Sequence, residues 1–480
     1  MTSLLRRSDS ADELCLMFKR REETIREINR RRQYDLAVVG GGIHGAIFAR
    51  LAAFNGLRTV LLESGDYACG ASGLSAVFSG AVQLDFSLSA LLSSRKRTGL
   101  LLDLVQTAGR LATFCRYRLP RGMPGLPALH ARVQEFFLGG KLGPPDGLPG
   151  SGLEFPGICC DERRIILENI FAARQEGAEC LNYASVQSVS SIGGAMACAL
   201  GWRDNVAGQN HELQARAIIN CAGAAAPAVG SLRTPESPLR FLRQTDLLFK
   251  PAWQQAAIVF APEQGEQLAV QPLEEGVLVS LVTQEGGGDY LQRAFDVLER
   301  RVPGQFSSAG LLWACSARRA VLPGSAPGRW VWHRGMYTLY GGNFACAAAT
   351  VWEGFKSIVA RTAGGFSPVP LFGRRLPGAG LTAEVERDFC ALADKYQLSP
   401  QIAARVLRRL GGRVRLIADK PGNFEVLEGD CLRAEVELAV CVDQARTSDD
   451  ILVRRMGLPG RSSSAGLVSK IELELSRLLS

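Results

Sequence analysis

A glycine turn between an apolar run and a helix-like segment most constrains this chain. Residues 34–46 read YDLAVVGGGIHGA, and Gly40, Gly42 and Gly45 fit the pattern G-x-G-x-x-G of a strand, a tight turn and a helix. Free amides at the start of such a helix attract a pyrophosphate. Glu63 ends a second apolar run about 20 residues later, where a carboxylate can accept ribose hydroxyls. The pattern predicts a bound dinucleotide; a glycine-rich turn without a ligand is the alternative.

The composition is that of a globular protein with a large core. The chain has 480 residues, of which 47% are hydrophobic and 21% charged. No apolar run has the length of a membrane span, and the first residues lack the pattern of a signal peptide. The 13 cysteines show no metal-ligand spacing, so we expect no metal site and buried thiols in a reducing compartment. We therefore expect a cytoplasmic protein, with peripheral contact to the inner membrane face as an option.

A basic N-terminal segment, residues 1–33, carries much of the net charge of +8. Arginines and glutamates alternate in its second half, which is typical of a solvated helix with ion pairs between neighbouring turns. The second interpretation is a helix that lies against a membrane, with apolar residues such as Phe18 and Ile25 in contact with lipid. Nucleic-acid binding is not expected, because no stacking aromatics or known motif accompany the charge.

The remaining patterns predict an α/β fold of several parts. A Rossmann-like domain is expected from two separated segments, 34–237 and 331–375, because the apolar run 217–223 suits a buried parallel strand. Alternating apolar and polar residues at 238–330 predict an inserted antiparallel β substrate domain. A helix is expected at 100–119, followed by an exposed Gly/Pro-rich excursion, and residues 381–480 predict a C-terminal α-helical cap domain.

Five segments together resemble one family of flavoproteins. They are the glycine turn at 35–46, the loop at 66–72, the helix at 161–168, the turn at 220–223 and ARTSDDILVRRMGL at 445–458. These segments resemble the FAD-dependent, quinone-linked glycerol-3-phosphate dehydrogenases, within the D-amino-acid-oxidase-like flavoproteins. The C-terminal segment is the most specific match, because other flavoproteins of this fold lack such a tail. Its Arg446, Thr447 and Asp450 are expected to cap and hold C-terminal helices.

The resemblance implies non-covalent FAD and assigns it contacts beyond the three glycines. It places the adenosine ribose at Glu63, the pyrophosphate region at Ser72, the adenine at the backbone of Val186, a close approach at Gly223, and the flavin pyrimidine edge at the helix after Gly342 and Asn343. A helix N-terminus at that edge would stabilise an anionic reduced flavin.

The expected substrate side departs from the family pattern. Ala76, Ser79 and Gln83 stand where the family has a lysine, a histidine and an arginine, and Asn343 begins a segment that lacks a second family lysine. A phosphate needs cationic donors, and a hydroxyl that loses hydride needs a base. Only Arg319 matches a substrate arginine of the family.

Two residues are candidates for substrate chemistry. Arg319 is expected to clamp the substrate, with a structural ion pair as the alternative, and His333 is a candidate base, with a satisfied structural histidine as the alternative. The resemblance implies hydride transfer from an alcohol carbon to flavin N5 and reoxidation by a quinone or similar acceptor. Glycerol 3-phosphate is the first substrate to consider. A different alcohol or amine, or a non-catalytic FAD-binding role, stays open because the expected cations are missing.

Overall fold

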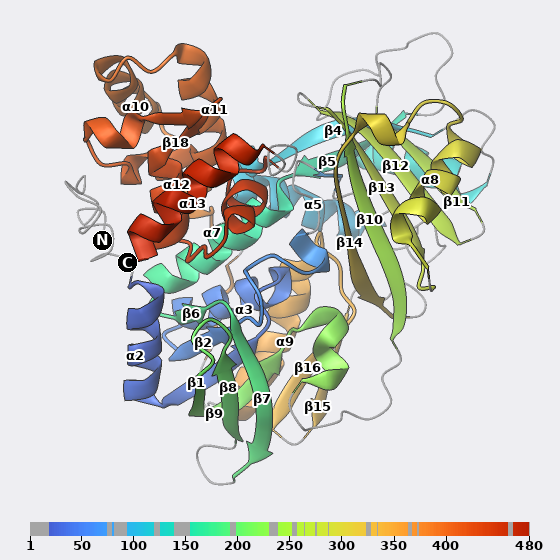
Figure 1. Ribbon diagram of the computed structural model, residues 1–480. Coiled ribbons are helices and arrows are strands. Elements are labelled where there is room, and N and C mark those ends of the chain that lie inside the picture. The colour runs from blue at the N-terminus through green and yellow to red at the C-terminus, as the bar shows by residue number, and fades with distance from the viewer. Residues whose placement is uncertain are drawn as a thin grey trace.

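A computed structural model describes most of the chain, and its elements form two large sheets and a group of C-terminal helices (Figure 1). The described residues are 19–73, 79–80, 94–119, 125–138, 154–192, 198–229, 239–251, 257–263, 265–273, 276–286, 288–322, 328–333, 335–362, 367–371, 374–458 and 464–479. None of the described helices is long and apolar enough to cross a bilayer.

In the first sheet, the glycine turn follows the interior strand β1. Its strand order is β15-β16-β9-β1-β2-β6, and the hairpin β7–β8 joins it through β9. The strands are β1 (Gln33–Val39), β2 (Thr59–Leu62), β6 (Glu179–Leu181), β7 (Ala184–Ser191), β8 (Cys198–Asp204), β9 (Asn210–Asn220), β15 (Arg329–His333) and β16 (Met336–Tyr340). Because β1, β2, β6, β9 and β16 are parallel, their carboxyl ends meet at the same edge.

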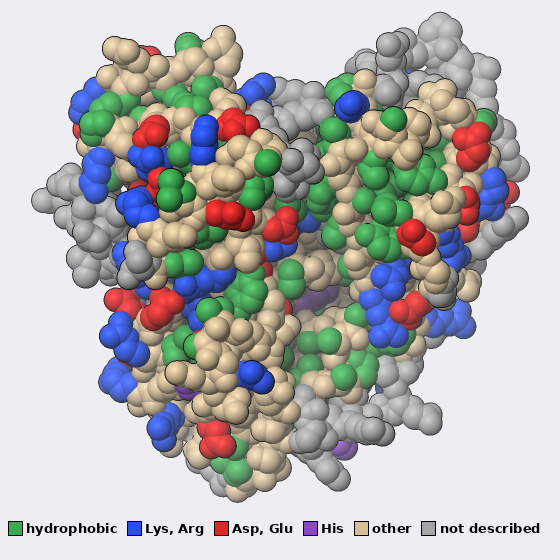
Figure 2. All heavy atoms as spheres, viewed as in Figure 1, with side chains coloured by type: hydrophobic (Ala, Val, Ile, Leu, Met, Phe, Trp, Pro, Cys, Tyr) green, Lys and Arg blue, Asp and Glu red, His purple; other side chains and the backbone are tan. Residues whose placement is uncertain are grey.

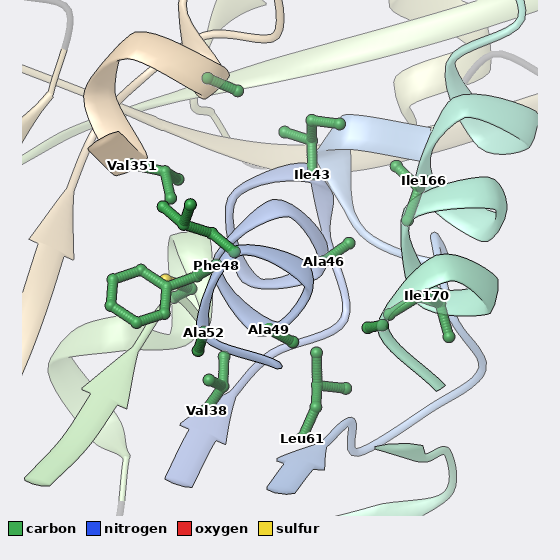
Figure 3. Packing of buried hydrophobic residues seen from close by; sticks show 14 of the residues in the cluster. Val38, Ile43, Ala46, Phe48, Ala49, Ala52, Leu61, Ile166, Ile170 and Val351 are labelled. Atoms are coloured by element: carbon green, nitrogen blue, oxygen red, sulfur yellow. The ribbon is translucent and has the colours of Figure 1, made fainter. Parts of the chain in front are cut away.

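Helices cover one face of this sheet. Helix α3 (Ile43–Phe54) lies directly on β1 and β2, between α7 (Glu162–Gln175) and α9 (Ala347–Thr362). Figure 3 shows Ala46 and Ala49 of α3 close to Leu61 of β2 and to Ile166 and Ile170 of α7. The small alanines allow the helix axes to approach closely. Burial of this apolar surface is the main favourable term in folding.

The opposite face of the first sheet is covered by α2 (Arg21–Arg31) and the β7–β8 hairpin. Ile28 of α2 packs with Tyr34 and Ala37 of β1, and Ile25 packs against the same cluster. Arg21 is buried in an ion pair with Asp204, 2.6 Å away. The helix is thus held by the protein, and Glu27 pairs with the arginines one turn later, as in the first interpretation of this segment. The membrane interpretation stays a prediction: Ile25 is partly buried within the protein, and Phe18 lies outside the described residues.

The second sheet is built on the order β14-β10-β13-β12-β11-β4-β5-β3. Its strands are β3 (Ser79–Gly80), β4 (Ala112–Arg118), β5 (Glu154–Cys160), β10 (Arg240–Phe249), β11 (Ile258–Glu263), β12 (Glu266–Leu273), β13 (Gly276–Gln284) and β14 (Leu311–Val321). Helix α8 (Tyr290–Arg301) packs on one face through Ala294, Val297 and Leu298. The antiparallel character expected for 238–330 is present in β10 to β14.

Three boundaries differ from the sequence expectations. The second sheet also takes β3, β4 and β5 from the first half of the chain, outside the expected insertion at 238–330. The expected helix at 100–119 ends earlier, because α5 (Ser94–Ala108) gives way to β4, where Thr113, Phe114 and Tyr117 favour a strand. The excursion after β4 contains a helix, α6 (Leu126–Leu138). Within the second expected FAD segment, β15 and β16 form a hairpin that turns at Gly335.

The C-terminal part is helical, as expected. It contains α10 (Ala383–Lys395), α11 (Pro400–Leu410), α12 (Arg433–Cys441), the π-helical turn η10 (Asp450–Arg455) and α13 (Ala465–Leu479). These helices form two apolar clusters of their own and meet the rest of the molecule at α7 (Figure 1). Asp450 accepts hydrogen bonds from the amides of Arg446 and Thr447, which confirms that these residues cap a C-terminal helix.

Substitution of Gly45 tests the contact between α3 and the turn before it. A Cβ atom at Gly45 would lie 1.9 Å from the carbonyl oxygen of Gly40, so the helix would have to move. We expect Gly45→Ala to lower the free energy of unfolding by about 3 kcal/mol or more, measured by urea denaturation. Gly99→Ala is the control, because Gly99 is helical and exposed with open space around it; this change should be neutral or stabilise by up to about 1 kcal/mol. Equal effects of the two substitutions would contradict the expected close packing.

Candidate functional site

A large cavity lies between the carboxyl edge of the first sheet and a face of the second. Its volume is about 1240 Å³, and its walls come from both sheets and from the turns that precede α3 and α9. Figure 2 shows the surface hollowed between these parts of the molecule. The position agrees with the rule that open α/β sheets bind ligands beyond the carboxyl ends of their strands.

The glycine turn forms the floor of this cavity. Gly40 has a positive φ of 105°, and a Cβ atom there would lie 2.7 Å from the carbonyl oxygen of Cys221 on the neighbouring strand. Gly42 is the N-cap residue of α3. A Cβ atom at Gly42 would lie 3.4 Å from the Ser72 hydroxyl oxygen. Gly45 does not line the cavity; it lies beneath it, against Gly40. The three glycines therefore serve the turn, the ligand approach and the helix packing.

Glu63 is fixed at the end of β2 by backbone amides. One carboxylate oxygen accepts from the Gly41 amide at 2.6 Å, and the other accepts from the Gly65 amide at 2.9 Å. Oε1 also accepts from the Ser64 hydroxyl at 3.1 Å, so Oε2 is the oxygen that keeps acceptor capacity for a further donor, such as a ribose hydroxyl. The carboxylate is thus held rigidly at the cavity wall next to the glycine turn.

The other expected cofactor residues also line this cavity. Ser72, Val186, Gly223, Gly342 and Asn343 all contribute to its wall. Gly223 has a positive φ of 57° and open space where a side chain would stand, which suits a close ligand approach. Asn343 accepts a hydrogen bond from the Cys346 amide at 2.9 Å and so orders the start of α9.

The second sheet supplies the opposite wall through strand alternation. In β13, Val277, Val279 and Leu281 pack toward α8, whereas Ser280 and Gln284 line the cavity. The register places Arg319, Leu242 and Gln284 in one row across β14, β10 and β13. The next row carries Gln244 on β10 and Gln267 on β12, separated by Val282. This wall thus combines apolar side chains, such as Leu242, Leu278 and Val282, with amides that can both donate to and accept from hydroxyl groups.

Arg319 brings a guanidinium group to this wall. Among the described residues it forms no ion pair or hydrogen bond, whereas its neighbour Arg318 pairs with Glu285 at 2.8 Å and stacks over Phe241. Burial lowers the pKa of Arg319, and the carboxylate of Glu162 partly opposes this shift. The guanidinium still carries its charge at neutral pH, so the alternative of a structural ion pair finds no support in the described part of the chain.

The end of β14 brings Arg319 to the second glycine turn. Leu322 follows this strand, and its amide lies 3.3 Å from where a Cβ atom of Gly341 would stand. The turn at 341–343 begins the segment that leads into α9. Arg319 and the turn at 341–343 therefore line the same cavity.

His333 is not brought to this site. It ends β15 and pairs with Met336 across the hairpin, at the edge of the sheet opposite the glycine turn, and it does not line the cavity. Its expected role as a base is therefore not supported by its position. Of the departures from the family pattern, Ala76 and Gln83 lie outside the described residues, and of Ser79 only the backbone, in β3, is described.

Sequence reasoning missed several cavity residues. His44 lies in the glycine turn and lines the cavity, and its Nε2 atom is buried without a hydrogen-bond partner among the described residues. Burial lowers the pKa of His44 to about 4, so its imidazole is neutral at pH 7. Glu162, at the start of α7, also lines the cavity near Arg319. The glutamines of the wall could be found only from the strand alternation in 267–284.

Comparisons with known proteins agree with this arrangement. A family described as "FAD dependent oxidoreductase" matches residues 35–376. D-erythritol 1-phosphate dehydrogenase from Brucella abortus is 26% identical, over 88% of this chain and 93% of its own length. The aerobic glycerol-3-phosphate dehydrogenase of Escherichia coli is 30% identical, but over only 39% of this chain and 40% of its own.

A solved structure has the same fold over almost the whole chain. The glycerol-3-phosphate dehydrogenase from Bacillus halodurans, complexed with FAD, superposes with a TM-score of 0.73 at 18% identity and covers 96% of this chain and 93% of its own. An L-alpha-glycerophosphate oxidase from Mycoplasma pneumoniae with FAD bound has a TM-score of 0.53 at 14% identity. The expected fold class is confirmed.

The residues of the cavity fit FAD. The turn after β1 offers free amides at the start of α3 to an anion, and Glu63 offers acceptors to a ribose. The backbone at Gly223 and Gly342 has the left-handed conformation that keeps side chains away from a ligand. FAD would be held by these residues.

The buried His44 makes the stability of the protein depend on pH. Its folded pKa of about 4 lies below the usual value of 6.5, so the unfolded chain binds the proton first as the pH falls. The free energy of unfolding should therefore fall between pH 6.5 and 4, by up to about 3 kcal/mol from this group. We expect His44→Gln to flatten this loss in denaturation curves at pH 7.5, 6 and 5. An unchanged pH dependence in the variant would contradict the buried neutral imidazole.

Proposed function

Because the chain belongs to the family of FAD-dependent oxidoreductases, we propose that it dehydrogenates a phosphorylated small alcohol and passes the electrons to a quinone-type acceptor. The uncommitted guanidinium of Arg319, next to the turn at 341–343, is the observation that carries this proposal. It provides a cation on the wall of the same cavity that the expected flavin edge lines. Glycerol 3-phosphate and D-erythritol 1-phosphate are the first substrates to test, since proteins similar to this chain are named for them.

Different cavity residues bind different groups of such a substrate. Arg319 binds the anionic group, and its fork geometry suits two oxygens of a phosphate. Gln244, Gln267 and Gln284 offer amides to the hydroxyl groups of the substrate from the same wall. The bound flavin supplies the acceptor of the hydride at its N5 atom. The walls of both sheets exclude water from the reacting carbon.

A proton must also leave the reacting hydroxyl. Among the described residues that line the cavity, neutral His44 and Glu162 are the candidates to accept it. Glu162 is the stronger candidate by position, because its carboxylate acts on Arg319 of the substrate wall, whereas His44 lies in the turn expected to hold the pyrophosphate. Glu162 would receive the hydroxyl proton as the hydride leaves the carbon.

Two alternatives follow from the small number of cations in the described wall. The site could accept a less anionic alcohol or an amine, with the glutamines as the main recognition groups. The chain could also be a non-catalytic FAD-binding protein. Peripheral membrane contact belongs to the proposal as the route to a quinone, and a vesicle co-sedimentation assay with the full chain would test it.

A spectrum under anaerobic conditions tests the substrate directly. We expect the flavin absorbance of the purified protein to bleach on addition of glycerol 3-phosphate or D-erythritol 1-phosphate, and not with unphosphorylated glycerol. Bleaching by glycerol alone, or by an amine, would favour the first alternative. Absorbance that persists with every alcohol and amine would favour the non-catalytic role.

Substitution of Arg319 tests the clamp. Loss of a charge-assisted pair to a phosphate costs about 2–3 kcal/mol, so Arg319→Ala should lower kcat/KM for the phosphorylated substrate about 30- to 150-fold. Arg319→Lys should recover part of this loss. Arg293→Ala is the control, because Arg293 lies on α8 and does not line the cavity. Equal kinetics of the Arg319→Ala variant and the unsubstituted protein would exclude this residue as the anion site.

A further inference from the structure

One short C-terminal segment contacts both loops that flank the adenosine side of the cavity. The segment runs from Gln444 to Arg455 and includes the turn η10. The two loops are 64–73, which follows β2 and Glu63, and 182–186, which comprises the turn between β6 and β7 and the first residues of β7. No described residue of the C-terminal segment lines the cavity itself. Any effect of the segment on a bound cofactor must therefore act through these loops.

The first contact converges on Asp66 in the loop after Glu63. Its carboxylate accepts from Arg454 Nε at 2.7 Å and from both terminal nitrogens of Arg455, one of them at 2.8 Å. The adjacent Tyr67 hydroxyl donates to the Gln444 side chain at 2.9 Å. Asp66 and Tyr67 are buried, so these bonds are shielded from water and salt. The C-terminal segment thus holds this loop through charge-assisted hydrogen bonds.

The second contact holds the loop that leads to Val186. The Tyr183 hydroxyl donates to the Asp450 carboxylate at 2.9 Å, and the Asn182 side chain donates to the Gln444 carbonyl at 2.9 Å. Tyr183 has a positive φ of 51°, which is unusual for a tyrosine and needs support from its surroundings. The contact to Asp450 supplies that support.

The two contacts belong to one ion network. Arg454 bridges Asp66 and Asp450, so a single side chain reaches the first loop and the partner of the second. Burial lowers the pKa of Arg454, but the carboxylates of Asp66 and Asp450 outweigh it and raise the pKa above its usual value. Removal of one member would leave buried charges without their partner, which is strongly destabilising.

Both loops present cofactor-binding backbone to the cavity. Loop 64–73 carries Ser72 and is tied to the glycine turn by a bond from the Ala68 amide to the Gly41 carbonyl, 3.2 Å long. The second loop is tied to Glu63, since the Ala184 amide donates to the Glu63 carbonyl at 2.6 Å. A shift of either loop would therefore move the expected ribose, pyrophosphate and adenine contacts together.

We infer that residues 444–455 form a positioning element of the FAD site, which holds both adenosine loops in their binding shape through Arg454 and Asp450. Binding of FAD and docking of this segment then stabilise each other, because coupling between two sites is reciprocal. The inference depends on FAD binding alone, so it stands or falls independently of the substrate.

Cofactor affinity of a matched pair of variants tests the inference. We expect Arg454→Gln to raise the dissociation constant of FAD by roughly 5- to 100-fold, measured by titration of the apoprotein with FAD and flavin fluorescence. Arg409→Gln is the control: Arg409 bonds to Asp430 and Glu435 within the C-terminal helices and contacts neither loop. The dissociation constant of FAD should be unchanged in the Arg409→Gln variant. An equal loss of affinity in both variants, or none in Arg454→Gln, would overturn the inference.

Hydrogen exchange of the unsubstituted protein tests the same inference without a variant, so it applies even if a variant does not fold. FAD should slow amide exchange in 444–455 and in the loops 64–73 and 182–186. It should change exchange in α10 and α11 much less, since these helices lie beyond the contact. Protection of the two loops by FAD without any protection of 444–455 would show that the segment is not coupled to the cofactor.

Discussion

The contact between Gly45 and the carbonyl of Gly40 sets the geometry on which the rest of the structure depends. It brings the first turn of α3 against the turn after β1, with no side chain between the two backbones at this point. The amides at the start of the helix then point to the edge where the parallel strands end. Glu63, the turn at Gly223 and the start of α9 meet at this edge because their strands are parallel to β1. The cavity is thus a consequence of one backbone contact and of strand direction.

The parts predictable from sequence were those set by local residues. The glycine spacing, the apolar run before Asn220 and the turn at Gly342 each encode their own conformation, and the residues assigned to the cofactor around them lie in or beneath one cavity. The C-terminal helices were likewise evident from their own pattern. Spacing and periodicity within about ten residues were enough for the first glycine turn and the helices, whereas Ser72, Val186, Gly223, Gly342 and Asn343 were assigned through the family resemblance.

The substrate wall was less predictable, because it depends on register between distant strands. Arg319 was identified by its resemblance to a motif, but its row with Gln284 arises only when β14 pairs with β10 and β10 with β13. His333 is a few residues from the cofactor turn in sequence, yet the hairpin of β15 and β16 takes it to the other edge. The strand β4 was missed because the apolar residues before it continue a helical pattern. Sequence distance is a poor guide wherever strands reverse direction.

The path of the chain between the two sheets has a consequence for biosynthesis. β1 pairs with β9, and β9 pairs with β16, while β3, β4 and β5 leave for the second sheet before β6 is made. Neither sheet is therefore a continuous stretch of chain, and the edges of β1 and β2 stay unpaired while much of the protein is still being synthesised. Non-local parallel pairing of this kind folds slowly and exposes strand edges to aggregation. Expression of either half alone should therefore give insoluble protein, and a nascent chain of this design depends on chaperones until its last parallel strand emerges.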